Sequence, residues 1–307
     1  MKNVYKVLSS AALAGMLLGG IAWGSIDTAA EAKGAASTDT SKSNASNKVS
    51  STQSGITINA ANAMYDGNYL RVELKSTGKK LDKKLIEKIE FFEILVDGKS
   101  IYEYGGGSIA KRPTLGLSPG PDADIVYLTS SDASWLGGNQ EAYPDKFKLT
   151  IKITLEGVKD PYTMEMPIQK SAEQPVVMKQ EQTKKSGNLS MSLKQVRATS
   201  ASTRLQWVLS GKDKEMMHDL MYDFVDDQGR ELEVLDGKGT DENNANGDYY
   251  FDYIIKALDP DAKSITIKPF TPEMEDPNAT SGAFKLDSNG EIIKNYNKDL
   301  EMTISVK

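Results

Sequence analysis

KFKLTIKITL, residues 146–155, alternates polar and apolar side chains without interruption. The apolar positions are Phe147, Leu149, Ile151, Ile153 and Leu155. Successive side chains of a β-strand point to opposite faces of a sheet, so all of these residues fall on one face. The period of two predicts a strand that covers a hydrophobic core with one face and meets solvent with the other.

Shorter stretches on both sides of this strand carry the same signal. In residues 68–75, NYLRVELK, the aliphatic residues Leu70, Val72 and Leu74 recur at every second position. Residues 91–96 and 99–104 flank Asp97-Gly98, and a D-G pair between two apolar runs predicts a β-hairpin. One short helix is expected at residues 82–90, where apolar residues recur at helical spacing. Further strands are expected at residues 124–128, 162–168, 188–196, 203–210, 220–225, 230–235, 249–257, 264–270 and 300–306.

The two halves of the chain have a similar order of predicted strands and turns. The hairpin around Asp97-Gly98 in the first half has a counterpart around Asp227-Gln228-Gly229 in the second. Short strands at intervals of about ten residues, separated by turns, are typical of immunoglobulin-like sandwiches. We therefore predict an all-β protein with two immunoglobulin-like β-sandwich domains in tandem, at residues 55–170 and 188–307. Polar residues and Pro175 mark residues 171–187 as the interdomain linker, with residues 176–178 as a candidate crossing strand.

The N-terminal segment predicts export. Two lysines, Lys2 and Lys6, precede an uncharged run over residues 7–26, and the small-residue motif Ala30-Glu31-Ala32 follows. This order is typical of a secretory signal peptide, here residues 1–32, and predicts an extracellular or envelope-associated protein. An uncleaved membrane anchor is the alternative, since the run approaches the ~20 residues that span a bilayer. Residues 33–54, rich in Ser, Thr and Asn, predict a flexible linker.

Composition narrows the classes of function. The 307 residues have a formal net charge of −6, contain 39% hydrophobic residues and include no cysteine. The hydrophobic fraction suffices for packed cores, and the acidic balance argues against nucleic acid as a partner. Without cysteine, the exported chain has to be held by core packing, and thiol catalysis and a cysteine-linked lipid are excluded. An exported chain without cysteine also favours a Gram-positive bacterial source.

Two motifs resemble known extracytoplasmic domains. Residues 64–72, MYDGNYLRV, resemble the opening YDG-x-x-L-x-V strand of a bacterial domain of unknown function. That domain lies on the outer side of Gram-positive anti-sigma-factor-type membrane proteins. Residues 222–230, YDFVDDQGR, are similar to a hairpin of the companion domain that often follows it. The resemblance implies a tandem extracytoplasmic β-module from about residue 56 onward, here without the cytoplasmic sigma-binding portion.

Catalytic chemistry has few candidates in this sequence. His218 is the one histidine of the chain, so any Ser-His-Asp triad would have to use it, yet no G-x-S-x-G motif accompanies it. Nothing in the sequence singles out a catalytic pair among the 43 acidic residues. We therefore expect a non-enzymatic protein without a cofactor. The alternative is a cell-wall polysaccharide hydrolase or esterase that uses Asp/Glu or His218.

A metal site and a ligand surface each have one candidate region. Residues 241–248, between Asp241 and Asp248, hold carboxylates, amides and a glycine that suit calcium, although a solvated hairpin loop explains them as well. Residues 105–121 and 135–143 combine glycine-rich loops with Lys111, Arg112 and Trp135, which suggests a ligand surface at one end of the first sandwich. Ordinary solvated loops explain both segments as well, and Trp135 in its glycine-rich context plugs one end of the sandwich core or, alternatively, stacks on a sugar ring. We expect an exported cell-surface binding or envelope-sensing module, whose partner is a cell-wall polymer or another envelope protein.

Overall fold

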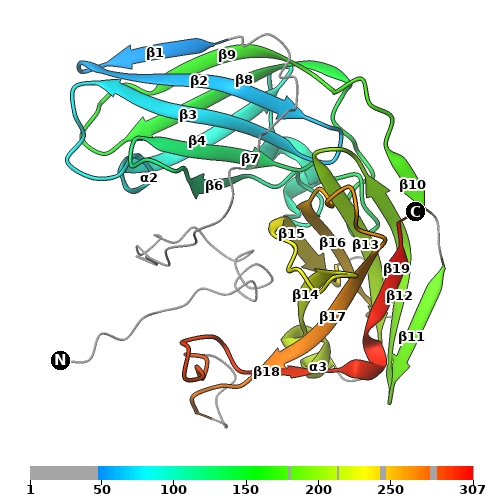
Figure 1. Ribbon diagram of the computed structural model, residues 1–307. Helices are drawn as coiled ribbons and strands as arrows, with labels where there is room; N and C mark the ends of the chain where they lie inside the picture. The colour runs from blue at the N-terminus through cyan, green and yellow to red at the C-terminus, as the bar shows by residue number, and fades with distance from the viewer. Residues whose placement is uncertain (1–47, 179–180, 213, 243–246, 277–281, 307) are drawn as a thin grey trace. The chain divides into compact units, whose positions relative to one another are not determined.

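The computed structural model describes residues 48–178, 181–212, 214–242, 247–276 and 282–306 (Figure 1). The described residues divide into two compact units. We call residues 48–175 together with Thr199–Ser202 the first unit, and the other described residues from Val176 onward the second unit. The predicted signal peptide, residues 1–32, lies outside the described residues, as does most of the predicted linker. No helix in the described ranges is long and apolar enough to cross a membrane.

Two antiparallel sheets build the first unit, and Figure 1 shows β3 between β2 and β7. The five-stranded sheet has the order β1 (Val49–Gln53), β2 (Ile56–Tyr65), β3 (Leu70–Gly78), β7 (Ile125–Ser130) and β6 (Gly116–Pro119). The four-stranded sheet has the order β5 (Lys99–Ser100), β4 (Ile89–Val96), β8 (Lys146–Leu155) and β9 (Tyr162–Gln169). Helix α2 (Leu85–Lys88) precedes β4, and the 3-10 helix η1 (Ile101–Gly107) follows β5.

The alternation in the sequence places one face of each sheet in a shared core. All five apolar residues of KFKLTIKITL are buried, as predicted, and β9 alternates buried and exposed residues throughout. Leu74 and Val126 of the first sheet join Ile94 and Ile151 of the second in one hydrophobic cluster. Full burial of a side chain of this size contributes about 1.5–3 kcal/mol. The all-β sandwich prediction is confirmed.

Part of the predicted N-terminal linker is a strand. Residues 49–53 form β1, which pairs with β2 from Val49 opposite Ala60 to Gln53 opposite Ile56. Ser54 and Gly55, with φ values of +52° and +79°, make the two-residue turn between these strands. The Tyr162 hydroxyl also donates a hydrogen bond to the Gln53 carbonyl at 3.1 Å. Backbone pairing orders this segment even though its side chains are mostly polar.

Two local predictions in the first unit meet different outcomes. The hairpin at Asp97-Gly98 is confirmed, with φ values of +50° and +86° that suit its tight turn. Its second arm is short, because η1 replaces the expected strand after Ser100. The helix expected at residues 82–90 is reduced to α2, because the chain joins the sheet as β4 from Ile89.

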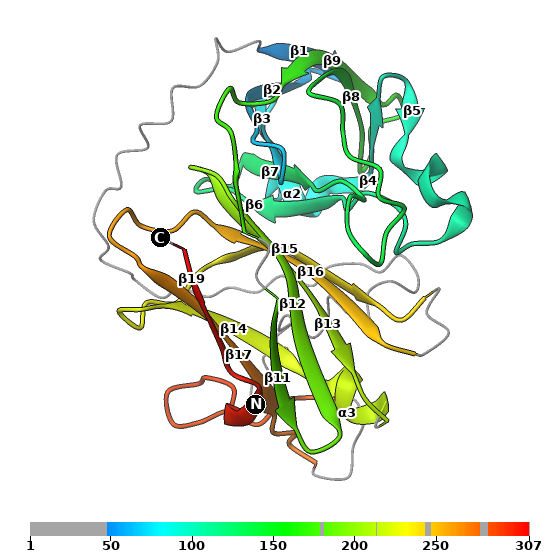
Figure 2. The ribbon, with the colours of Figure 1, turned by 90° about the vertical axis from the view of Figure 1, so that its right-hand side faces the viewer.

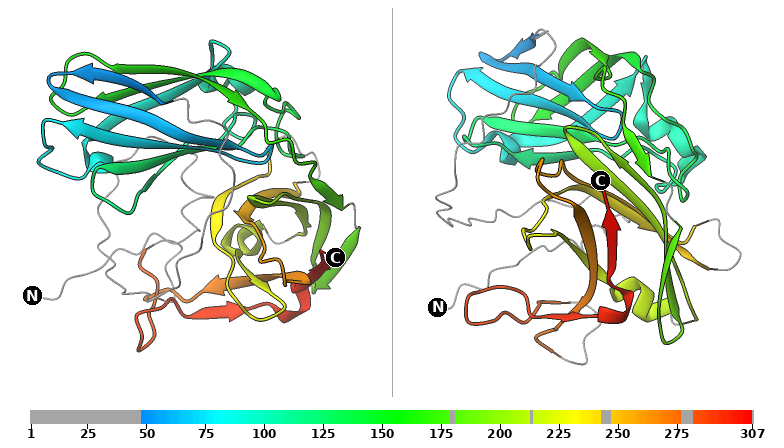
Figure 3. Two further views of the ribbon diagram at one scale, coloured as in Figure 1. Left: turned by 45° about the horizontal axis from the view of Figure 1, so that its top comes forward. Right: turned by 45° about the vertical axis from the view of Figure 1, so that its right-hand side comes forward.

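The second unit also contains two antiparallel sheets. One has the order β10 (Val176–Met178), β12 (Leu189–Ala198), β13 (Ser202–Ser210), β16 (Tyr249–Lys256) and β15 (Val234–Thr240), with β11 (Gln182–Ser186) also paired to β12 (Figure 2). The other has the order β14 (Met221–Asp226), β17 (Ser264–Pro272) and β18 (Lys294–Tyr296), with β19 (Met302–Ser305) also paired to β17 (Figure 3). Two short helices are α3 (Lys214–Asp219) and η2 (Lys298–Leu300).

An aromatic cluster fills the core of the second unit. The Trp207 ring stacks on Phe251 and Tyr253, with centroids 5.3 and 5.1 Å apart. Its edge meets the ring of Tyr222 at 4.9 Å. Trp207 is fully buried, and aromatic pairs at these separations add about 0.5–1.5 kcal/mol beyond the burial of their area. This cluster holds the two sheets together without a disulfide.

Two predictions for the second unit need correction. In the segment predicted as a linker, residues 171–187, residues 176–178 form β10, where a candidate strand was expected, and residues 182–186 form β11, which was not expected. Both pair with β12, and β11 can do so because edge strands tolerate polar side chains. The strands expected at residues 220–225 and 230–235 do not form a hairpin ladder. The turn at Gly229 is present, and the bridge between Val225 and Glu231 is flanked by backbone hydrogen bonds from Asp226 to Arg230 and from Leu232 to Phe224, but the pairing ends there. The chain then crosses to the other sheet, where β15 pairs with β16.

Candidate functional site

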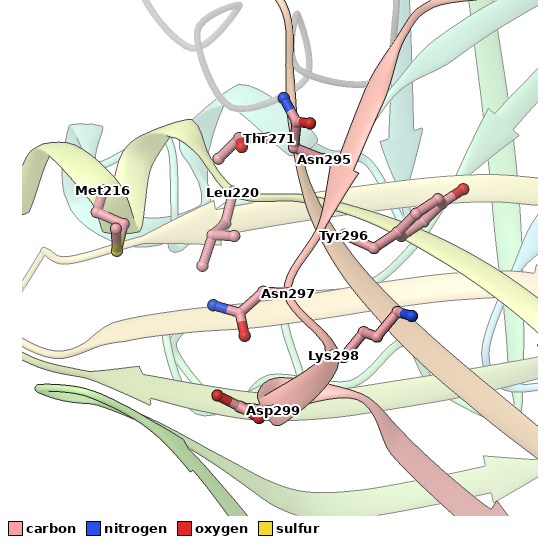
Figure 4. Close-up of a pocket in the computed structure, with 8 residues that line it drawn as sticks. All are labelled: Met216, Leu220, Thr271, Asn295, Tyr296, Asn297, Lys298 and Asp299. Carbon is pink, nitrogen blue, oxygen red and sulfur yellow. The ribbon is translucent and has the colours of Figure 1, made fainter.

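A pocket of ≈ 470 Å³ opens in the second unit (Figure 4). Its volume lies within the range of about 300–1,000 Å³ that is usual for sites that bind small molecules. Four elements contribute to it: α3 and the residue after it, β17, β18 and η2. The lining residues are Met216, Leu220, Thr271, Asn295, Tyr296, Asn297, Lys298 and Asp299.

The pocket lies where the edge of a sheet is interrupted. β18 pairs with the last residues of β17, and β19 pairs with its first residues. Between them the backbone N–H of Asn297 donates to the Pro269 carbonyl at 2.8 Å, and the chain then turns into η2. The Asn297 side-chain oxygen accepts the N–H of Leu300 at 3.3 Å, and Leu300 is fully buried. These contacts hold the turn in place.

The two sides of this segment differ in chemistry. Figure 4 shows Asn297 and Asp299 on the side of the chain that faces Met216 and Leu220, while Tyr296 and Lys298 point the other way. The pocket therefore has an apolar wall from the α3 region and a polar wall from β18 and η2. The polar wall offers amide donors and acceptors together with one carboxylate.

A polar anchor on the other side of β18 fixes the strand. Lys294 Nζ donates to the Asp223 carboxylate oxygens at 2.9 and 2.7 Å, and the Tyr296 hydroxyl donates to Oδ2 at 2.7 Å. Lys268 Nζ lies 4.3 Å from the centroid of the Tyr296 ring. Burial and the neighbouring Asp223 carboxylate raise the pKa of Tyr296, so its phenol stays protonated at neutral pH. These contacts hold β18 in place, so the residues on its pocket side have a fixed position.

Of the two roles considered for Trp135, the structure supports the buried one and removes this residue from the candidate ligand surface. Its indole is 1% exposed, and Nε1 donates to the Ala110 carbonyl at 3.2 Å. A Cβ at Gly138 would lie 2.4 Å from Trp135 Cδ1, so the chain passes directly against the ring. Trp135 therefore joins the two loop segments as a buried clamp, and its ring is not available for stacking on a ligand.

One of the two predicted cations, Arg112, lies beside an exposed aromatic ring. Lys111 and Arg112 are half-buried, and the Arg112 guanidinium carbon is 5.4 Å from the centroid of the Tyr102 ring. Tyr102 is 44% exposed and was not among the predicted surface residues. Nearby, Lys99 Nζ lies 3.8 Å from the centroid of the Tyr104 ring. The end of the first unit that carries η1 thus combines cations with accessible aromatic surface.

His218 is placed away from the pairings that a catalytic triad needs. It lies on α3, is exposed, and packs its ring edge-on against Tyr249 with centroids 4.9 Å apart. Within the described part of the chain, no serine hydroxyl forms a hydrogen bond with it. The alternative of a hydrolase or esterase through His218 gains no geometric support.

The calcium candidate between Asp241 and Asp248 falls partly outside the described residues, because residues 243–246 belong to a gap. In the ranges that the structure describes, no group of three or more His, Asp or Glu side chains is arranged to hold a metal ion. The calcium hypothesis for this loop stays a prediction.

The YDG motif has a structural role in the first unit. Asp66 is buried, and its Oδ1 accepts the backbone N–H groups of Asn68 and Tyr69 at 2.8 and 2.9 Å. Its Oδ2 accepts the hydroxyls of Thr199 and Ser202, residues of the same unit, at 2.6 and 2.5 Å. The motif that carried the resemblance therefore organises a turn.

Sequence reasoning missed the pocket residues of the second unit. The sequence signal was the run NYNKD, residues 295–299, in which Asn295, Asn297 and Asp299 alternate with other side chains. Alternation of this kind places them on one side of an extended chain. From the sequence alone, this run cannot be distinguished from a solvent-exposed edge strand, because the α3 region that completes the pocket is far away in the sequence.

Comparisons with known proteins add a family match and a fold. Residues 174–304 match a family of unknown function (DUF5643), a range that includes the pocket. A crystal structure of a conserved domain protein from Bacillus anthracis aligns with 87% of this chain and 94% of its own, at 11% identity and a TM-score of 0.56. At that identity the likeness shows the fold alone. Bovine butyrophilin aligns with 80% of the chain and 93% of its own, at 9% identity and a TM-score of 0.21, too low to indicate a shared fold. No curated protein sequence matches the chain.

Proposed function

We propose that the chain is an exported, non-enzymatic binding or envelope-sensing module of the bacterial cell surface. The lysines, apolar run and Ala-Glu-Ala motif at the N-terminus support export. The two all-β units support binding, because sandwiches present loops and edges for recognition on a rigid framework. Resemblance to the outer domains of anti-sigma-factor-type proteins supports a sensing role at the envelope.

The loop surface at the η1 end of the first unit is the observation that carries this proposal. We define the loop surface as Tyr102, Lys111 and Arg112. The buried Trp135 clamp fixes the backbone beneath it, so the cations and the ring need little ordering when they bind. A guanidinium over an exposed tyrosine presents charge and flat apolar area together, which suits an anionic cell-wall polymer.

The acidic net charge is compatible with an anionic ligand. At physiological ionic strength, charges are screened over about 8 Å, so a polymer at the loop surface experiences mainly its local charges. The formal charge of −6 belongs to the whole chain and includes carboxylates far from the loop surface in sequence. Attraction to Lys111 and Arg112 should therefore weaken as salt is raised.

A retention assay on purified Gram-positive cell walls tests the proposal. The full chain and its Lys111→Glu/Arg112→Glu variant are incubated with walls at low and high salt, and the bound fraction is measured. Lys80→Glu/Lys146→Glu is the matched control, because it makes the same charge change at exposed positions of the first unit. We expect several-fold lower, salt-sensitive retention of the first variant only. Equal and salt-insensitive retention of all three proteins would refute the loop surface.

A second assay addresses the sensing role. Deletion of the gene in its native host should change the transcript level of an extracytoplasmic sigma-factor regulon under envelope stress. Complementation by the wild-type chain should restore the response, whereas the Lys111→Glu/Arg112→Glu variant should not. An unchanged regulon in the deletion strain would leave binding as the function and remove sensing.

A further inference from the structure

We infer that the pocket between β18, η2 and the α3 region is a binding site for a neutral saccharide. This site is separate from the loop surface, and the inference does not depend on the proposed function. It rests on the chemistry of the lining, its charged groups and the broken edge of the sheet.

The polar wall suits hydroxyl groups. A sugar hydroxyl both donates and accepts hydrogen bonds, and the side-chain amides of Asn295 and Asn297 and the hydroxyl of Thr271 do the same. The Asn297 oxygen is held by the N–H of Leu300, which leaves its NH₂ group oriented to donate. The Asp299 carboxylate accepts from hydroxyls, and hydrogen bonds to a charged acceptor are the stronger ones.

The charged groups of the lining disfavour an anionic ligand. Lys298 and Asp299 are the charged residues of the lining set, and Lys298 points away from the pocket side while Asp299 faces it, so the charge presented to a ligand is a carboxylate. A phosphate or carboxylate site would present several cationic donors, usually including arginine. This pocket instead presents two amides, one hydroxyl and one carboxylate, a set that accepts and donates hydrogen bonds to hydroxyl groups.

The apolar wall suits the C–H face of a sugar ring. Met216 is 45% exposed and lies opposite the polar wall with Leu220. A methionine side chain is flexible and polarisable, so it can adapt to a ring laid against it. Covering it removes apolar surface from water, which contributes roughly 25 cal/mol per Å². A saccharide has the matching division into a polar rim and apolar faces.

The broken strand edge separates a saccharide from a peptide. An extended peptide would bind by continuing a sheet, and it needs an uninterrupted row of backbone donors and acceptors. Here η2 interrupts the edge between β18 and β19, and Asn297 turns its backbone N–H inward to Pro269. The pocket lies at that interruption. It therefore presents side-chain groups, which suit a compact ligand, and lacks the row of backbone donors and acceptors that an extended peptide would need.

Binding of defined trisaccharides to the full chain tests the inference. Chitotriose, maltotriose and cellotriose are titrated by calorimetry, with saturation-transfer NMR to locate the contact. We expect one of them to bind, and Asn295→Ala and Asp299→Ala each to raise its Kd at least tenfold. Met216→Asn should also weaken binding by removing the apolar wall. Thermal melts of each variant confirm that the fold is retained.

Matched controls keep the result specific to the pocket. Asn188→Ala and Leu286→Asn change exposed residues of the second unit outside the lining set, and both should bind as the wild type does. The Lys111→Glu/Arg112→Glu variant should also bind normally, which distinguishes failure of this site from failure of the loop surface. The inference is overturned if no trisaccharide binds at 10 mM, if the pocket variants bind like wild type, or if trialanine binds in preference.

Discussion

Replacement of Trp135 tests whether the loops of the first unit are clamped as described. The indole is 1% exposed, and its N–H donates to the Ala110 carbonyl. Truncation of a buried tryptophan to alanine costs about 3–5 kcal/mol, and the lost hydrogen bond is included in that range. Trp135→Ala should therefore lower the free energy of unfolding of the first unit by about 4 kcal/mol.

Trp135→Phe separates the hydrogen bond from the packing. It removes the indole N–H and part of the ring volume, so we expect a smaller loss of about 1.5–2.5 kcal/mol. Leu136→Ala is the control. The Leu136 side chain is next to Trp135 in the sequence and is 43% exposed, so its truncation should lower the free energy of unfolding by less than about 0.5 kcal/mol.

Urea unfolding of the full chain, followed by circular dichroism, measures these losses, and limited proteolysis reports cleavage near residues 105–121. The clamp is refuted if Trp135→Ala costs less than about 1 kcal/mol, or no more than Leu136→Ala. Such a result would mean that the indole is exposed in solution and is available for a ligand after all.

Three further predictions concern stability. Asp66→Ala removes an acceptor of four hydrogen bonds, two from backbone N–H groups and two from hydroxyls. It should lower the free energy of unfolding in urea by about 3 kcal/mol, and a decrease of less than about 1 kcal/mol would contradict the buried network. Burial raises the pKa of Tyr143 and Tyr253 above the ordinary value of 10.0. The contribution of these two tyrosines to stability should therefore be constant below pH 10 and be lost as pH rises above it, and a melting temperature that is flat from pH 9 to pH 12 would contradict this. Hydrogen bonds from Gln228 and Arg230 lower the pKa of Asp261 below 3.8, so the contribution of Asp261 to stability should be present above pH 3.8 and be lost as pH falls further. Arg230→Met should reduce this loss of stability in acid, and an unchanged dependence on pH would count against the Arg230–Asp261 interaction.

The strands that cover a core with one face could be predicted from the sequence. β8 has the bounds expected for KFKLTIKITL, and the turn at Asp97-Gly98 joins two strands as expected. In both places a strict local rule applies, since period-two alternation fixes the buried face and a D-G pair fixes the turn. Tertiary contacts did not have to be known to predict either feature.

Polar edge strands could not be predicted in the same way. β1 and β11 consist mainly of Ser, Thr, Gln and Lys, and the sequence indicated linkers there. Both are ordered by ladders to the buried strands β2 and β12, whose own hydrophobic patterns were visible. An edge strand needs backbone partners more than apolar side chains, so its signal lies in the hydrophobic strand that follows it across a two-residue turn.

Turn signals predicted bends without predicting partners. The bend at Gly229 is present, and Asp226 Oδ1 accepts the N–H groups of Gln228 and Arg230 around it. The strands that flank it nevertheless belong to different sheets, because β14 pairs with β17 and β15 pairs with β16. A turn motif reports local backbone geometry, and the burial of each strand decides which strand it joins.

The candidate sites follow from the same distinction. The position of Lys111 and Arg112 in a glycine-rich loop could be read from the sequence, and their role as a ligand surface stays a proposal. The burial of Trp135 depends on its contacts with Ala110 and Gly138. The pocket depends on a single break in an edge. Leu300 is apolar in a polar run, and its burial pulls η2 inward while Asn297 caps the turn.

Placing that break opposite Met216 requires the whole second unit, since some eighty residues separate α3 from η2 along the chain. Replacement of Leu300 by a polar residue should therefore remove the pocket by releasing η2, even though Leu300 is outside the set of residues that line it. Asn295, Asn297 and Asp299 supply the polar groups of the pocket. The pocket forms because the buried Leu300 holds η2 in place. A search for binding residues among edge strands should accordingly begin from isolated apolar residues that interrupt a polar alternation.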